Sequence, residues 1–340
     1  MKIFYAVQAT GNGHISRAME LLPYLQQYGE VDIFLSGDNS NLQLDAPIKY
    51  RSKGISLYYN CHGGLNYWQM IKEIHPIRVR EEIKQLPVEK YDLILNDFDY
   101  ITSAACARKK MPSIHFGHQA SFLSPATPRP AKKSRAGEWL LKQYVKATQQ
   151  VGLHFESYDD FIFGAVVKKE ICNAVPTDKN YITVYLPSYC EPELIKIFQA
   201  FPAFRFEIFS RQSSTIRQER NMTFLPVNKQ LFNNSLIHCS GLISGGGFET
   251  PAEALQLGKK FMARPIRGQY EQQCNAAALK QLGITTLPDI DEYFSTHFYN
   301  WICNAPAIQK DYSNTIPQCL DHIFNLSETN AAVSALFEEV

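Results

Sequence analysis

A histidine beside two glycines is the first feature of the sequence that could do chemistry. The stretch GNGH at 11–14 follows an apolar run at 2–8 and precedes an amphipathic run at 16–29. This order predicts a strand, a glycine turn and a helix, with His14 at the turn. The positive end of a helix disfavours an imidazolium, so we expect His14 to be neutral and able to accept a proton. A histidine that only caps the helix is the alternative.

Two carboxylates could orient such a base. Asp97 and Asp99, in LILNDFDY, end the predicted strand at 91–97. A catalytic histidine usually has a carboxylate that orients it and stabilises its cation. We favour Asp97, which lies closer to the strand end, although both residues could instead cap a predicted helix at 100–110.

A glycine-rich stretch far along the chain could hold an anion. In SGGGFETPAEAL (244–255), three glycines separate a predicted strand from a predicted helix. Backbone N–H groups can approach a diphosphate closely there, and the helix N-terminus adds partial positive charge. Thr250 adds a hydroxyl, and Glu253 can accept two hydrogen bonds from a ribose diol. A tight turn without a ligand would have the same sequence.

The elements that must position these residues form two α/β series. Short apolar runs alternate with amphipathic ones up to about residue 150, and the pattern restarts at 181. Such alternation predicts parallel sheets covered by helices, with ligands at the carboxyl ends of the strands. We predict two Rossmann-like domains facing a cleft. The expected ranges are 1–172 for the acceptor domain, 173–320 for the donor domain and 321–340 for a terminal helix that packs back on the first domain.

The run from Phe224 to Ala276 resembles the donor-nucleotide signature of glycosyltransferases with the GT-B architecture, including the UDP-glycosyltransferases. The matching positions are Phe224, Pro226, Val227, Gly247, Phe248, Thr250, Glu253, Pro265, Glu271 and Gln272. The N-terminal ATGNGHISRAMEL is similar to a turn of the bacterial N-acetylglucosaminyltransferase that forms lipid II, and to uncharacterised microbial members of the same superfamily.

The resemblance implies roles for most of the matched positions. His14 becomes the catalytic base. The donor nucleotide contacts Phe224, Val227, Ser244, Gly245, Gly246, Gly247, Phe248, Thr250 and Glu253, and the donor sugar contacts Glu271 and Gln272. In HFGHQASF (115–122), at the end of the next predicted strand, His118 and Gln119 are expected to face the cleft as well, so the acceptor or phosphate side comprises Gly11, Asn12, Gly13, His118 and Gln119. Gly245 stands where the signature has a phosphate-binding histidine, so Ser244 or neighbouring N–H groups must replace that donor.

The expected function is inverting transfer of a sugar from a nucleoside-diphosphate sugar, with UDP as the preferred nucleotide. Retaining enzymes of this architecture often carry two Glu eight residues apart, and the partner of Glu253 would fall on Gly245. The acceptor could be a lipid-linked or cell-envelope glycan. A nucleotide-sugar epimerase and a non-catalytic nucleotide-sugar-binding protein are the alternatives. An NAD site is disfavoured because Ser16 replaces the third glycine of its fingerprint.

Composition narrows the remaining classes. The net charge of +1 gives no general attraction to nucleic acid, and the eight Cys include no C-x-x-C pair. We therefore expect a cytoplasmic protein that needs no cofactor and no metal. No signal peptide and no run of 18 apolar residues is seen. The basic loop at 129–135 could be a solvated loop, or could place the protein peripherally at the inner face of a membrane.

Overall fold

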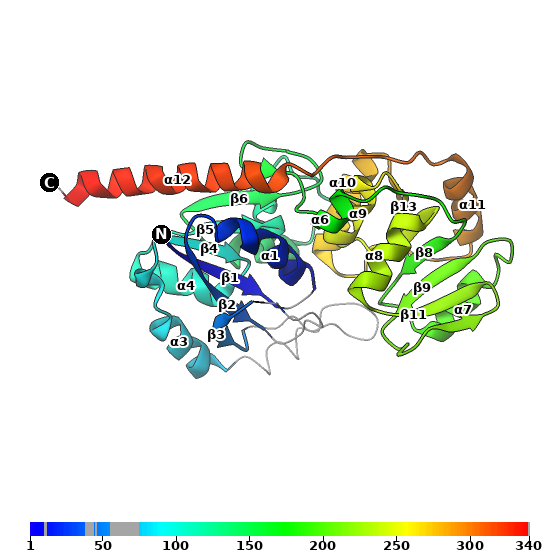
Figure 1. Cartoon of the computed structure of the whole chain (residues 1–340), viewed down its shortest axis with the longest axis horizontal. Helices are drawn as coiled ribbons and strands as arrows, with labels where there is room; N and C mark the ends of the chain where they lie inside the picture. The colour runs from blue at the N-terminus through cyan, green and yellow to red at the C-terminus, as the bar shows by residue number, and fades with distance from the viewer. Residues whose placement is uncertain (10–11, 38–43, 45, 55–74, 339–340) are drawn as a thin grey trace.

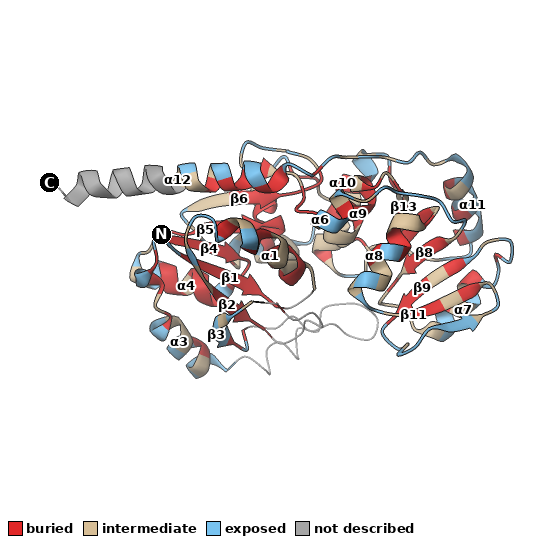
Figure 2. Ribbon diagram, in the orientation of Figure 1, coloured by how far each residue is buried: buried red, intermediate tan, exposed pale blue. Residues whose placement is uncertain are grey.

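The computed structural model describes the chain except for residues 10–11, 38–43, 45, 55–74 and 339–340 and for the side chains of residues 327–338. Two seven-stranded sheets lie side by side, each covered by helices (Figure 1). Buried residues concentrate on the strands of both sheets (Figure 2). The largest buried apolar cluster contains residues of both halves, among them Leu95 and Leu242, while two smaller clusters each belong to one half.

The first sheet is parallel throughout. Its strands, in spatial order, are β3 (Ile48–Ser52), β2 (Glu30–Ser36), β1 (Lys2–Gln8), β4 (Leu93–Asp97), β5 (Ile114–Gly117), β6 (Gln149–Leu153) and β7 (Ile162–Phe163). The helices of this half are α1 (Asn12–Leu25), α3 (Pro76–Gln85), α4 (Tyr100–Lys109), α5 (Arg135–Gln143) and the short 3₁₀ helices η1 (Val88–Lys90) and η2 (His118–Leu123). Both β1 and β4 are buried almost throughout, which suits central strands of a parallel sheet.

The second sheet is parallel except at one edge, where β10 pairs antiparallel with β11. Its order is β10 (Arg217–Glu219), β11 (Met222–Pro226), β9 (Phe206–Ser210), β8 (Ile182–Tyr185), β12 (Gly241–Ser244), β13 (Lys260–Ala263) and β14 (Thr285–Thr286). The helices of this half are α7 (Glu191–Phe198), α8 (Lys229–His238), α9 (Glu249–Gln256), α10 (Tyr270–Gln281) and α11 (Phe294–Asn304).

The chain crosses between the halves twice. The first crossing contains α6 (Lys169–Cys172), and the second leads back from α11 to α12 (Thr315–Glu338), which runs along the first half (Figure 1). Near its start α12 packs on that half, where the ring of Phe324 stacks on Tyr28 with centroids 3.8 Å apart. Among the described residues, no helix has the length and apolarity needed to cross a membrane.

Two sequence expectations need correction. The helix expected at 16–29 begins four residues earlier, at Asn12, so His14 lies inside its first turn. The helix expected from 138 to 150 ends at Gln143, and Gln149 begins strand β6. Ser134 starts that helix because its side chain accepts a hydrogen bond from the N–H of Gly137.

Candidate active site

The expected base and one of its two candidate carboxylates lie together. Nδ1 of His14 is 2.8 Å from Oδ1 of Asp97, the last residue of β4. The side chain of Asp97 is fully buried, whereas 12% of the His14 side chain is exposed. Asp99 has the capping role, because its carboxylate accepts a hydrogen bond from the N–H of Thr102 at the start of α4.

Arg17, which the sequence analysis missed, completes this group. It lies one turn after His14 and is 2% exposed. Its Nε and Nη2 are 3.0 and 2.8 Å from Oδ2 and Oδ1 of Asp97, a bidentate pair. Burial alone would raise the pKa of Asp97, but the charge of Arg17 and the contact with His14 lower it to about 2. Asp97 is therefore an anion at neutral pH.

The charges assign the tautomer of His14. Nη2 of Arg17 also lies 2.9 Å from Nδ1 of His14, but a guanidinium can only donate and an ionised carboxylate can only accept. Since Nη2 already donates to Asp97, the favourable arrangement places the His14 proton on Nδ1, directed at the carboxylate. Nε2 then keeps its lone pair, as a general base requires.

The same arginine reaches the second half of the molecule. Nη1 of Arg17 lies 2.8 Å from Oε1 of Glu249, the first residue of α9. A Cβ atom on Gly13 would lie 2.4 Å from Oε2 of Glu249, so any other residue there would displace the Glu249 carboxylate from its present position. The N-terminus of α1 and that of α9 are thus in direct contact.

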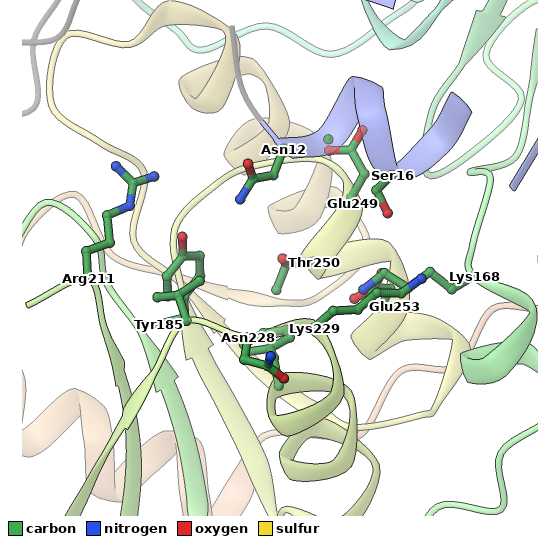
Figure 3. Close-up of a pocket in the computed structure, with 13 residues that line it drawn as sticks. Asn12, Ser16, Lys168, Tyr185, Arg211, Asn228, Lys229, Glu249, Thr250 and Glu253 are labelled. Atoms are coloured by element: carbon green, nitrogen blue, oxygen red, sulfur yellow. The ribbon is translucent and has the colours of Figure 1, made fainter. Parts of the chain in front are cut away.

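A cavity of about 290 Å³ opens beside this contact (Figure 3). Predicted residues that line it are Asn12, Gly13, Val227, Thr250 and Glu253. Residues that were not predicted are Ser16, Lys168, Tyr185, Arg211, Asn228, Lys229, Phe232 and Glu249. Figure 3 shows Thr250 and Glu253 on one wall, with Arg211 and Tyr185 across from them.

The glycine loop follows β12, as predicted, and a side chain holds it in place. Oε1 of Gln272 accepts hydrogen bonds from the N–H groups of Gly246 and Ile266, at 3.2 and 2.9 Å. A Cβ atom on Gly246 would lie 2.9 Å from the Gln272 carbonyl oxygen, whereas one on Gly247 would meet nothing within 4 Å. Gln272 therefore supports the loop with its oxygen and leaves only its amide NH₂ for a sugar.

Two predicted aromatic contacts are buried instead. Phe224 is 0% exposed in the core of the second half, and the guanidinium of Arg217 lies 4.7 Å from its ring centroid. A nucleotide base cannot stack on that ring in this conformation, which corrects the expectation. Phe248 is 3% exposed and stacks on His118 with centroids 3.9 Å apart, so it joins the two halves. Val227, by contrast, is 37% exposed at the cavity.

Glu253 is buried and ion-paired. Its Oε1 lies 2.8 Å from Nζ of Lys168, on the first crossing between the halves. Burial raises the pKa of Glu253, and the charge of Lys168 opposes that rise. One carboxylate oxygen remains outside this pair and could receive a ribose hydroxyl.

His118 and Gln119, two of the residues expected on the acceptor side, lie at a second contact between the halves. His118 is 1% exposed, and its ring nitrogens face the Leu153 carbonyl and Oδ1 of Asn275 at 3.0 and 2.8 Å. Nε2 of Gln119 lies 3.2 Å from Oε2 of Glu271, the residue expected at the donor sugar. His118 is thus enclosed rather than open to a substrate.

Two further predicted positions lie at the end of β12. Ser244 is 3% exposed at the end of β12, and Gly245 follows it with Oε1 of Gln272 3.6 Å from the place of a Cβ atom. Gly11 lies outside the described residues. Within the described residues, no three His, Cys, Asp or Glu side chains are grouped as metal ligands.

Comparison with known proteins places this geometry in context. The family model for glycosyl transferase family 1 matches residues 1–306. No curated protein matches the sequence. Among solved structures, the glycosyltransferase SnogD from Streptomyces nogalater aligns with a TM-score of 0.54 and 16% identity over 99% of each chain.

Two further structures are similar to the same extent. MurG from Acinetobacter baumannii aligns with a TM-score of 0.56 and 13% identity, over 95% of this chain and 99% of that one. UGT89C1 from Arabidopsis thaliana, complexed with UDP-L-rhamnose, aligns with a TM-score of 0.56 and 12% identity, over 96% and 93%. These likenesses confirm the predicted α/β architecture of two facing Rossmann-like halves, the GT-B fold.

Proposed function

Because the chain belongs to glycosyl transferase family 1 and is a glycosyltransferase, we propose that it moves a sugar from a nucleoside-diphosphate sugar to an acceptor hydroxyl with inversion. The observation that carries this proposal is the pairing of the buried, ionised Asp97 with His14, directly after Gly13, which lines the cavity. In the Nδ1–H tautomer that this pairing favours, Nε2 keeps its lone pair and can take a proton.

The reaction needs one base and one anion-binding wall. Nε2 of His14 takes the acceptor proton while the acceptor oxygen forms a bond to C1 of the sugar. The bond from C1 to the diphosphate breaks, and its electron pair leaves with the diphosphate. Direct displacement of this kind inverts C1. Asp97 stabilises the imidazolium that forms.

The donor fits the side of the cavity formed by the second half. The N-terminus of α9 and Thr250 face the cavity, and Arg211 and Lys229 line it too. We propose that these groups hold the diphosphate and that they replace both the missing histidine at Gly245 and a divalent cation. Glu253 then receives the ribose, and UDP is the preferred nucleotide.

The acceptor side includes a surface suited to an anionic membrane. Helix α5 is held against α10, because the Tyr270 hydroxyl donates to Oε1 of Glu138 at 2.7 Å. On the same helix Trp139 is 64% exposed, and the preceding Lys132, Lys133 and Arg135 are exposed as well. We propose that this surface contacts the inner face of the membrane, where a lipid-linked glycan serves as acceptor.

Thermal unfolding with UDP, TDP, GDP and NAD tests the donor assignment. A nucleotide at about 100 times its Kd stabilises the folded state by about 2.7 kcal/mol, so Tm rises by several degrees. We expect the largest rise with UDP. The variant His14→Ala should keep this rise and lose about 10²- to 10⁴-fold of sugar transfer, measured as UDP release from UDP-sugars. A rise with NAD alone would contradict the proposal.

A further inference from the structure

Arg17 is the one side chain among the described residues that contacts both Asp97 and Glu249. We propose that Arg17 is a positioning residue, which ties the orientation of His14 to the docking of Glu249 from the donor-binding half. The inference rests on the proposed function, because His14 is the base there. No sugar, phosphate or acceptor group needs to touch Arg17 in this role.

The geometry leaves the guanidinium little freedom. Its Nε and Nη2 contact both oxygens of Asp97, and its Nη1 contacts Glu249, so two carboxylates on different halves fix one plane. Asp97 is held in turn with Oδ1 at Nδ1 of His14. Gly117, at φ 120°, provides space for this pair, since a Cβ atom there would lie 2.8 Å from Oδ1 of Asp97.

Glu249 connects Arg17 to the second half of the molecule. It begins α9 directly after the glycine loop, lines the cavity and is 26% exposed in its side chain. Figure 3 shows it reaching α1 beside Asn12 and Ser16. If the two halves separate, Nη1 of Arg17 loses its carboxylate and the buried cation keeps only Asp97 as a partner. Arg17, Asp97 and Glu249 therefore all have their charged partners only in the docked arrangement.

This coupling limits the conformation in which His14 is oriented to accept a proton. In the docked arrangement Arg17 holds Asp97, and Asp97 holds His14 as the Nδ1–H tautomer. In an open arrangement Arg17 can turn toward solvent or Nδ1, and the orientation of His14 is no longer fixed. Deprotonation of the acceptor is thus confined to the closed molecule, where water has less access to the donor sugar.

Nitrogen NMR of the histidine rings tests this without any substrate. The chain has nine His, and His14→Ala identifies the His14 signals. At pH 8 we expect wild type to show one His14 tautomer, with Nδ1 protonated. Glu249→Ala and Arg17→Lys should show both tautomers, while Glu249→Gln, which still accepts from Nη1, should resemble wild type. An unchanged single tautomer in Glu249→Ala and Arg17→Lys would overturn the proposal.

Kinetics separates positioning from direct donor contact. Glu249→Ala should lower kcat for UDP release from UDP-sugars by about 10- to 100-fold, the usual cost of a misplaced reacting group. The Kd for UDP, measured by calorimetry, should not increase. Combining Glu249→Ala with Asp97→Asn should cost no more than Asp97→Asn alone. Effects that multiply, with weaker UDP binding, would make Glu249 a donor ligand and overturn the inference.

These readouts also distinguish the two proposals from each other. If the nucleotide panel shows no UDP binding but the His14 tautomer still depends on Glu249, the donor assignment fails and the coupling stands. If UDP binds and is released in turnover but the His14 tautomer does not change in Glu249→Ala, the coupling proposal fails and the glycosyl transfer proposal stands.

Discussion

At the scale of single residues, Gly13 makes the sharpest prediction. An Ala at this position would place its Cβ 2.4 Å from Oε2 of Glu249, the end of a flexible side chain. The carboxylate can move away, so we expect Tm to fall by only a few degrees. Its bond to Arg17 would break, however, and UDP release should fall as far as in Glu249→Ala.

Gly247→Ala is the matched control for Gly13→Ala. A Cβ atom there meets nothing within 4 Å, so the fold has no reason to lose stability. If the diphosphate binds the glycine loop as proposed, it would meet that methyl group, and UDP should bind more weakly. If Gly13→Ala instead weakens UDP binding and spares kcat, the contact between the helix starts serves only the donor.

Residue types alone single out His14 and Asp97 but not Arg17 and Glu249. His14 stands out because it directly follows a glycine turn, and Asp97 because it lies at the end of a predicted strand. Arg17 does not stand out, because arginines are almost never fully buried unless paired and the sequence pattern starts the helix only at Ser16. Once α1 begins at Asn12, Arg17 follows His14 by three residues on the same face. Glu249 requires knowledge of how the two halves meet, which local sequence does not contain.

At the scale of elements, the loop after β9 and the start of α8 lead to the next prediction. They carry Arg211 and Lys229, two cations at the cavity. If each makes one charge-assisted contact with the diphosphate, Arg211→Ala and Lys229→Ala should each weaken UDP binding about 10- to 100-fold. Calorimetry at two salt concentrations would show the loss and a reduced salt dependence. Lys280→Ala, at the exposed end of α10, is the control and should bind UDP as wild type does.

The proposed membrane contact of α5 and of the basic residues before it predicts binding to anionic vesicles. Sedimentation with phosphatidylcholine vesicles containing anionic phosphatidylglycerol should retain wild type. Each cation near such a surface contributes about 1 kcal/mol, so Lys132→Glu with Lys133→Glu should release most of the protein. Trp139→Ser should weaken retention further, whereas Tyr293→Ser, an aromatic that is 61% exposed in the other half, should not. Equal retention of all variants would leave the loop as a solvated one.

Element prediction from the sequence succeeds where burial is continuous. The central strands β1, β4 and β12 are predicted because apolar runs between turn signals mark buried parallel strands. The region after α5 is wrongly predicted as helix, because no turn signal separates the helical pattern from Gln149 and Gln150, which belong to β6. The two-residue strands β7 and β14 leave almost no periodic signal, and only their pairing with a neighbouring strand reveals them.

At the scale of the whole molecule, the buried ion pair predicts how stability responds to acid. The pKa of Asp97 is about 2 in the folded protein, against an ordinary value of 3.8. A carboxyl group with a lowered pKa in the folded state stabilises the fold at pH values above its ordinary pKa. This stabilisation is lost as the pH falls through the pKa of the folded state. The difference corresponds to about 2 kcal/mol, present above pH about 4 and lost toward pH about 2. Urea unfolding at a series of pH values should show this loss in wild type.

Asp97→Asn cannot titrate at this position, so it provides the comparison. The neutral amide would leave Glu249 as the only carboxylate paired with Arg17, and the variant should be less stable than wild type at pH 7. Its free energy of unfolding should then depend less on pH between about 4 and 2, and the two curves should converge as acid protonates Asp97 in wild type. Curves that stay parallel through this range would mean that Asp97 is not held as an anion in the folded protein. His14 would in that case lack the oriented carboxylate on which the proposed base depends.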